Sequence, residues 1–462
     1  MQKVNLLLPI LLAIIIAIAF PNWLTWNERV VLSTVLLMLF WWISETVPMA
    51  VTALLPLLIL PMAGVISVDK LAPVYGDKFV FLFLGGFLLA LAIEKHALHK
   101  RLAFALLDLA GNKKSNILFA VMISSYVLSM WISNTATALM FMPIAASVAL
   151  LLSHGKDQIR LKRALVLGVA YAASIGGMAT VIGTPPNVAA VGIVDKQFGE
   201  SISFFEWMKF GVPFSLVLLT AVFFTLKYLH FKHSERIEGA HDSLHELRRE
   251  LGSWSKEQRV VFVVFMLAVV AWVFQQPIST YFNLPGFNDT FIALSAGVLL
   301  FFLPSKQANE RILEWTDTKD LNWGVLLMFG GGLAISTAFK EVGLLDRMVV
   351  LLSSASDWSA ASYLILLCGV GLILTALMSN LAMVTIFVPI VGVLASQLGV
   401  EVSSFVIPVT LAASCDFMFP MSTPPNAIAY GTGWVKAKEM FGIGILVNLI
   451  AFALLCILVW LG

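Results

Sequence analysis

Apolar segments long enough to cross a bilayer follow one another along almost the whole chain of 462 residues. Some 60% of the residues are hydrophobic and only 12% are charged, which is more apolar surface than a water-soluble domain can bury. The first segment ends without a small-residue cleavage site, so we expect a retained span and not a signal peptide. The sequence predicts an all-α polytopic membrane protein with about eleven transmembrane helices, at roughly 4–20, 29–47, 50–64, 79–94, 164–193, 209–227, 260–275, 289–303, 321–339, 402–430 and 441–461.

The basic residues divide unevenly between the two sides of these spans. With the N-terminus in the cytoplasm, 22 of the 29 Lys and Arg residues fall inside and seven fall outside. Because cytoplasmic loops carry the excess of positive charge, this division predicts a cytoplasmic N-terminus and an external C-terminus. It leaves no Lys or Arg for the membrane interior, and all seven histidines lie on cytoplasmic flanks.

Two further apolar runs, 116–153 and 363–397, carry a polar motif near their middle. The motif is Ser133-Asn134-Thr135 in the first run and Ser379-Asn380-Leu381 in the second. Each half of the first run is about 16–18 residues, or roughly 25 Å of helix, which is slightly short for a ~30 Å hydrocarbon core. Length alone equally permits re-entrant hairpins and pairs of full spans with the motif as an outer turn. The matching polar break at Thr-Pro-Pro-Asn, also mid-membrane by position, leads us to predict re-entrant hairpins.

The two motifs belong to an internal repeat with an offset of 246 residues. Because each repeat crosses the membrane an odd number of times, the second is predicted to be inverted relative to the first, as in many secondary transporters. The expected organisation is a first span in 1–28, repeat 1 in 29–230, a cytoplasmic linker in 231–259 and repeat 2 in 260–462.

Each repeat also contains the sequence Thr-Pro-Pro-Asn, at Thr184–Asn187 and Thr423–Asn426. A proline pair removes two backbone donors and disfavours helix at the preceding residue. Unwound backbone within a membrane must be paired with protein, ions or a ligand. A single kink of this kind is usually structural, but the matched pair predicts helices broken at 183–187 and 422–426 by ligand-binding loops.

A broken helix exposes carbonyl groups at one end and amide groups at the other. The carbonyl ends suit a small hard cation and the amide ends suit an anion. Single Ser or Thr residues in apolar helices commonly bond back to their own helix, so the prediction rests on the pairing. The predicted cation ligands are Ser129, Ser133, Asn134 and the Gly183 carbonyl in one half, and Thr375, Ser379, Asn380 and the Ser422 carbonyl in the other. The predicted anion contacts are Asn134, Thr135, Thr184, Pro185, Asn380, Leu381, Thr423 and Pro424.

The charge distribution limits the chemistry of such a site. With no Lys or Arg in the membrane interior, a bound divalent anion meets only neutral donors and helix dipoles. Its burial then requires bound cations that offset its charge. The sequence therefore predicts cation-coupled anion transport.

These motifs resemble those of the divalent anion/sodium symporters, which include the bacterial Na⁺/dicarboxylate symporters of the INDY type. The resemblance covers essentially the whole chain, and two further segments carry it, Trp41-Trp42-Ile43-Ser44-Glu45-Thr46-Val47-Pro48 and Ser414-Cys415-Asp416-Phe417. It implies a homodimeric, elevator-type transporter of the bacterial cytoplasmic membrane with eleven spans and two re-entrant hairpins. It also implies uptake of C4-dicarboxylates such as succinate, malate and fumarate with several Na⁺ ions, and no cofactor beyond this coupling ion.

Two residues, Leu381 and Asp416, differ from the pattern that the resemblance implies. Leu381 occupies the position where the bacterial dicarboxylate carriers usually have a second threonine, so one hydroxyl donor to the anion is lost. Asp416 is an acid within a predicted span, and such residues are functional candidates by default. It is expected to bind a proton or cation, or to face a polar partner across the bundle.

Other readings remain open at this point. The lost hydroxyl at Leu381 favours a sulfate or other divalent-anion symporter as the alternative, and an anion channel is a third reading. An enzyme is not expected, because the sequence offers no metal-ligand cluster, Ser/His pair or intramembrane acid dyad. We also expect no nucleic acid partner.

Overall fold

The computed structural model describes residues 9–461 apart from 12, 16, 19–23, 45, 108–112, 153–154, 232–248, 250, 307–309, 345–346, 348–357 and 377. Within these residues the chain is helical, apart from isolated β contacts such as the bridge between Pro304 and Arg311. The predicted all-α class is confirmed. Much of the predicted first span and of the predicted linker 231–259 lies outside the described residues.

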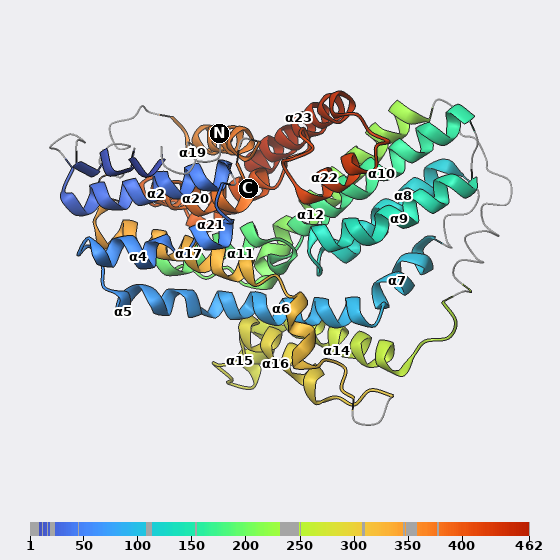
Figure 1. Cartoon of the computed structure of the whole chain (residues 1–462), viewed down its shortest axis with the longest axis horizontal. Coiled ribbons are helices and arrows are strands. Elements are labelled where there is room, and N and C mark those ends of the chain that lie inside the picture. Colours follow the sequence, from blue (N-terminus) through green and yellow to red (C-terminus); the bar gives the residue numbers. More distant parts are fainter. Residues whose placement is uncertain are drawn as a thin grey trace.

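The first described helices form one side of the molecule. They are α2 (Trp26–Ser44), α3 (Met49–Thr52), α4 (Leu55–Met62), α5 (Val68–Leu71), η1 (Ala72–Gly76) and α6 (Lys78–Lys95). Figure 1 shows α5 and α6 following each other as one long rod across the molecule. The side chain of Asp77 starts α6 by accepting a hydrogen bond from the amide of Phe79 at 3.0 Å.

The first hairpin run and the first broken helix follow. Their elements are α7 (Leu98–Leu107), α8 (Lys114–Ser129), α9 (Asn134–Leu152), α10 (Gly155–Met178), η3 (Val181–Gly183), α11 (Pro185–Phe198) and α12 (Phe204–His230). The turn between α8 and α9 coincides with Ser133-Asn134. The interruption between α10 and α11 lies at the first Thr-Pro-Pro-Asn sequence, with a proline as the first residue of α11.

The second half repeats this pattern. After α14 (Lys256–Val273), α15 (Gln275–Tyr281), α16 (Asp289–Phe302), η4 (Trp315–Asp320) and α17 (Trp323–Glu341) come α19 (Ala360–Thr375), α20 (Asn380–Gln397), α21 (Val402–Ala413), α22 (Pro424–Gly431) and α23 (Ala437–Leu461). The helices α19 and α20 form the second helix pair, and α21 and α22 form the second broken helix.

Six described helices are long and apolar enough to cross a membrane. A seventh span is possible if α14 and α15, which are bent by 72° relative to each other, count as one. Each hairpin run consists of two separate helices, α8 and α9 in the first and α19 and α20 in the second. The helices α8, α19, α21 and α22 are shorter than the 18 residues required of a full span. The chain therefore combines full-length helices with short apolar ones.

Close helix packing depends on glycine at a few points. A Cβ atom at Gly85 of α6 would collide with the backbone of Ala293 in α16, and one at Gly331 of α17 would collide with Ala53. Small residues at helix contacts allow such approach. Gly331 therefore permits the close approach of α17 to Ala53.

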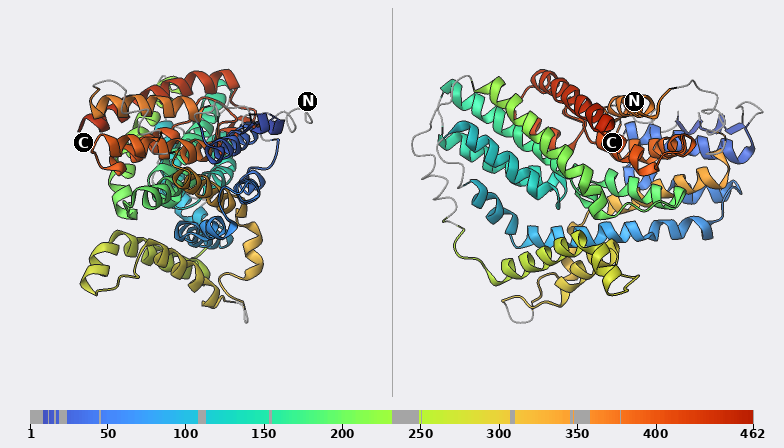
Figure 2. Two further views of the ribbon diagram at one scale, coloured as in Figure 1. Left: turned by 90° about the vertical axis from the view of Figure 1, so that its left-hand side faces the viewer. Right: turned by 180° about the vertical axis from the view of Figure 1, so that it is seen from behind.

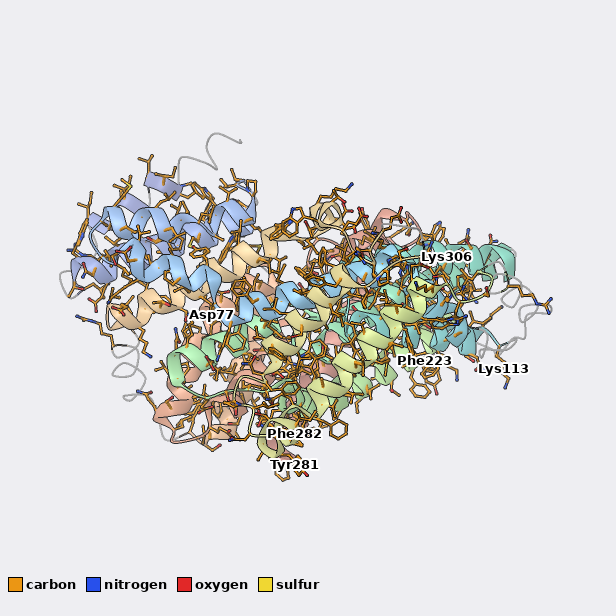
Figure 3. The ribbon with its side chains drawn as sticks, turned by 90° about the horizontal axis from the view of Figure 1, so that it is seen from below. Asp77, Lys113, Phe223, Tyr281, Phe282 and Lys306 are labelled. Atoms are coloured by element: carbon orange, nitrogen blue, oxygen red, sulfur yellow. The ribbon has the colours of Figure 1, made fainter. Side chains whose placement is uncertain are left out.

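The helices α14, α15 and α16 lie on one side of the molecule, below the remaining helices in Figure 2. Figure 3 shows Tyr281 and Phe282, at the end of α15, pointing outward from its edge. These two side chains are 84% and 63% exposed. This part of the surface is apolar, as expected of a protein surrounded by lipid.

The two halves interlock around the broken helices. The helix α22 of the second half contacts α9 and α10 of the first, and α11 of the first half contacts α20 and α21 of the second. Each broken helix is thus packed against the hairpin run of the other half. This arrangement brings segments about 240 residues apart in sequence to a common region.

Candidate functional site

The predicted anion contacts lie at four helix N-termini. The helices α9, α11, α20 and α22 begin at Asn134, Pro185, Asn380 and Pro424. The amide groups of a first helical turn have no partner within the helix, and the helix dipole makes this end positive. All four helices therefore present the feature that binds anions without a basic side chain.

The residue before each of these helices is Ser or Thr. The hydroxyl of Ser133 accepts a hydrogen bond from the amide of Ala136 at 3.2 Å, and that of Ser379 accepts from Ala382 at 3.3 Å. Thr423 accepts from the amide of Asn426 at 3.4 Å, whereas Thr184 makes no cap bond. In α9 and α20 other first-turn amides remain available to a ligand. The helices α11 and α22 begin with two prolines, which have no amide hydrogen, so their contribution is the helix dipole and the preceding threonine.

The predicted cation ligands form the same contact in both halves. The hydroxyl of Ser129 donates to Oδ1 of Asn134 at 2.8 Å, and that of Thr375 donates to Oδ1 of Asn380 at 2.8 Å. Each pair joins the last turn of one hairpin helix to the first residue of the next. Hydroxyl, amide and carbonyl oxygens are the ligands that hard cations prefer.

Each hairpin turn is also connected to the broken helix of its own half. In the first half, a Cβ atom at Gly177 would collide with the side chain of Asn134, and Thr180 donates its hydroxyl hydrogen bond to the carbonyl of Met130. In the second half, Thr375 donates to the carbonyl of Ala413. The hairpin turn of each half is therefore in contact with the end of the helix that precedes the break, although the two come from separate parts of the sequence.

The asparagine that ends each Thr-Pro-Pro-Asn sequence holds the unwound backbone in place. Nδ2 of Asn187 donates to the carbonyls of Gly177 at 2.9 Å and Thr180 at 2.8 Å. Nδ2 of Asn426 donates to the carbonyls of Asp416 at 3.3 Å and Phe419 at 3.2 Å. In both halves the acceptors lie ten and seven residues before the asparagine. Because both asparagines are fully buried, these bonds replace the ones that water would otherwise make.

We call Asn187 and Asn426, with the carbonyls that accept their hydrogen bonds, the asparagine braces. The site predicted from the sequence did not include these residues. Asn187 and Asn426 belong to the recognised motif, and their matched position in both repeats was the signal available. Thr180 and Gly177 have no such signal, because their roles depend on contacts with the distant hairpin turn.

The position after each motif asparagine differs between the halves. Thr135 is half-buried, whereas Leu381 is 6% exposed and belongs to the main hydrophobic core. Thr184 and Thr423 are both buried, and Pro424 is exposed. Of the predicted anion contacts, Leu381 is thus the apolar member enclosed by other apolar side chains.

Asp416 lies in the unwound segment before α22 and is fully buried. Neither of its carboxylate oxygens has a hydrogen-bond partner in the described part of the chain. Ser422 is close enough to act on the carboxylate, but its hydroxyl donates to the carbonyl of Phe419 at 2.7 Å. The structure therefore does not bear out the expectation of a polar partner across the bundle among the described residues.

Comparison with known proteins agrees with this geometry. The family model of the sodium:sulfate symporter transmembrane region matches residues 2–461. The sodium-dependent dicarboxylate transporter SdcS of Staphylococcus saprophyticus is 36% identical, over 99% of this chain and 91% of that protein. SdcS of Staphylococcus aureus is 34% identical with the same coverage.

Two solved transporter structures share the fold. YdaH of Alcanivorax borkumensis has a TM-score of 0.54 at 13% identity, over 86% of this chain and 87% of that one. MtrF of Neisseria gonorrhoeae, from a class of antimetabolite efflux pumps, has a TM-score of 0.58 at 11% identity, over 85% and 83%. The nearly full-length match to the family model shows that this chain belongs to the sodium:sulfate symporter family, the divalent anion/sodium symporters that its motifs resemble.

Proposed function

We propose that this protein is a secondary active transporter that carries C4-dicarboxylates, such as succinate, malate and fumarate, into the cytoplasm together with Na⁺. One observation supports this most directly: four helix N-termini, each preceded by Ser or Thr, occur together with two equivalent Ser/Thr–Asn oxygen sites. The SdcS relatives are sodium-dependent dicarboxylate transporters, which makes a dicarboxylate the first substrate to test.

In this proposal, the two carboxylates of the substrate bind to the two halves of the site. One carboxylate accepts hydrogen bonds from the Asn134–Thr135 and Thr184–Pro185 segments. The other accepts from the Asn380–Leu381 and Thr423–Pro424 segments. Helix N-termini supply the positive end of a dipole, so both carboxylates are stabilised without a basic residue.

Two Na⁺ ions bind beside the substrate in the same proposal. The first is held by Ser129, Ser133, Asn134 and the carbonyl of Gly183, and the second by Thr375, Ser379, Asn380 and the carbonyl of Ser422. These neutral oxygens fit a small monovalent cation. The positive charge of the two Na⁺ ions offsets the charge of the dianion, so that neither the ions nor the substrate is buried without the other. Coupling of the two ligands follows from this mutual compensation.

Radiolabelled succinate uptake into proteoliposomes tests the proposal. An inward Na⁺ gradient is expected to drive accumulation, whereas an equal K⁺ gradient is not. Equal uptake under both gradients would contradict Na⁺ coupling. A very rapid succinate flux that does not saturate with substrate and has no fixed ratio to Na⁺ would indicate a channel instead.

A sulfate or other divalent-anion symporter is the second candidate. The buried Leu381 removes a hydroxyl from the half-site where Thr135 supplies one in the other half. Competition distinguishes the two candidates: sulfate that displaces labelled succinate at equal concentration would favour the alternative. Absence of sulfate competition is expected for a dicarboxylate carrier.

We further propose that α8–α9 and α19–α20 are re-entrant hairpins. The turn of the first packs against other helices through Trp131, which stacks on Phe204 and Trp272 at centroid distances of 6.0 and 6.1 Å, while Ser133 is exposed. The proposed architecture also includes inverted repeats 29–230 and 260–462, an elevator-like motion and a homodimer. The cytoplasmic N-terminus and external C-terminus in a bacterial cytoplasmic membrane follow from the distribution of basic residues.

A further inference from the structure

The two halves of the site differ at one equivalent position. The brace bonds define this equivalence: Asn187 and Asn426 each donate to the carbonyl of the residue ten positions earlier, which is Gly177 in one half and Asp416 in the other. The first half therefore has no side chain at this point, and the second half has a carboxylate. The inverted pseudosymmetry of the chain is broken here by a full negative charge.

The carboxylate of Asp416 has no compensating group of its own. It is fully buried, and both oxygens lack a hydrogen-bond partner within the described residues. None of the described ion pairs includes it, and no basic side chain is among the groups that act on it. A buried charge without such a partner is strongly destabilising, so something absent from the chain itself must offset it.

Other unpartnered oxygens come from the same segment. The hydroxyl of Ser414 and Oδ1 of Asn426 are buried and make no hydrogen bond in the described part of the chain. Nearby donors are already engaged: the hydroxyl of Tyr171 donates to the carbonyl of Phe417 at 3.2 Å, and the amide of Phe417 donates to Asn448 at 3.3 Å. The segment thus offers several acceptors, and none of these groups donates to the carboxylate within the described residues.

We propose that Asp416 is the anionic ligand of a further Na⁺ site in the second broken helix, with Ser414 and Asn426 as candidate additional ligands. In the first half, Ser174 and Asn187 have equivalent unpartnered oxygens, but Gly177 takes the place of the acid, so the anionic ligand has no counterpart there. It deepens the proposed Na⁺-coupled symport and rests on it. A dianion and one carboxylate carry three negative charges, so the loaded site is neutral with three Na⁺ ions.

The substitution Asp416→Asn tests this site, because asparagine has nearly the shape of a protonated aspartic acid. The ratio of Na⁺ to succinate, obtained from reversal potentials in proteoliposomes, is expected to be three in the unaltered protein and two in D416N. A ratio of two in the unaltered protein, or an unchanged ratio in D416N, would overturn the proposal. The second result would mean that a proton neutralises the acid.

A binding measurement separates this inference from the proposed function. Purified protein without substrate is titrated with Na⁺, with K⁺ as the reference salt, and its thermal stability is followed. D416N is expected to need at least tenfold more Na⁺ for half-maximal stabilisation, and a change below twofold would overturn the site. If wild-type uptake proves independent of Na⁺, the symport proposal fails while this titration still decides the site.

Two additional variants complete the design. Asp416→Ala replaces D416N if the latter is not monodisperse, since the equivalent position tolerates the absence of a side chain. Thr410→Val is the matched control in α21, because the buried Thr410 hydroxyl bonds only within its helix, to the carbonyl of Val406 at 2.7 Å. This control is expected to retain the Na⁺ midpoint of the unaltered protein, and the same loss in T410V as in D416N would overturn the assignment.

Discussion

The asparagine brace of the first broken helix provides the most direct test of how this site is built. Asn187 is fully buried, and its amide nitrogen donates to two carbonyls at 2.9 and 2.8 Å. Replacing Asn187 with Ala removes both donors at once. The carbonyls of Gly177 and Thr180 then lose these bonds in a region from which the surrounding protein and lipid exclude water.

The expected size of the effect follows from those two bonds. A buried acceptor that loses its donor costs about 1–3 kcal/mol, so two such acceptors cost about 2–6 kcal/mol. About 3 kcal/mol reduces the population of the correct loop roughly a hundredfold, because each 1.4 kcal/mol is a factor of ten. Asn187→Asp is expected to be worse than N187A, since a carboxylate would face both carbonyls without a proton to donate.

The assay is Na⁺-dependent succinate uptake together with thermal stability in detergent. N187A is expected to lower uptake more than tenfold and to lower the melting temperature. Asn426→Ala should cause a smaller loss, because its bonds are longer, at 3.3 and 3.2 Å. Thr34→Val is the control, since the buried Thr34 hydroxyl bonds within α2 at 2.8 Å. Uptake and stability of N187A within twofold of the unaltered protein would refute the brace.

Three other perturbations address the ligands and the motion. Ser129→Ala and Thr375→Val remove the hydroxyls bound to Asn134 and Asn380, and each is expected to raise the Na⁺ concentration for half-maximal uptake about tenfold. An unchanged Na⁺ dependence would argue against both cation sites. Leu381→Thr is expected to shift the preference between succinate and sulfate and to cost about 1–3 kcal/mol of stability. The buried Leu394→Thr, in the same helix, should destabilise without changing preference, and an unchanged profile in L381T would remove position 381 from the substrate contacts. The ion pairs Lys78–Asp195 and Lys196–Asp77, both at 2.8 Å, join α11 to the start of α6, so the double variant D195N/K196Q should speed an elevator motion about two- to fivefold. Lys70→Ala breaks the Lys70–Glu341 pair between α5 and α17 and should leave the rate unchanged, whereas equal rates in all three proteins would argue against relative movement of α11 and α6.

The sequence predicts those features of the fold that local chemistry determines. Prolines 185 and 424 fall at the first helical position, where a missing amide hydrogen costs nothing, so the helix resumes at each Thr-Pro-Pro-Asn sequence. The interruptions begin earlier than the predicted 183–187 and 422–426, since α10 ends at Met178 and α21 ends at Ala413. Ser133 and Ser379 act as helix caps, which explains why both hairpin turns coincide with Ser-Asn. The predicted span 79–94 agrees with α6 to within one residue at each end.

Features that depend on distant contacts were beyond the sequence. The second break is longer than the first, since α21 ends at Ala413 and α22 begins at Pro424. Its residues Cys415, Phe417, Met418 and Phe419 are apolar, and their composition is typical of a continuous span. The contacts of α9 with α22 and of α11 with α20 likewise carry no local signal, because they join repeats through packing alone.

The comparison of the two halves indicates how an inverted repeat acquires unequal roles. Repetition preserves the backbone features: the capped helix starts, the Ser/Thr–Asn pairs and the asparagine braces occur in both halves. Divergence affects side chains that the backbone does not require, at Thr135 and Leu381 and at Gly177 and Asp416. The first half retains the hydroxyl donor for an anion, while the second replaces it with leucine and adds a carboxylate one loop away. In the proposed site the two halves keep a symmetric frame for their ligands, and the added carboxylate is expected to make the second half favour cations more strongly than the first.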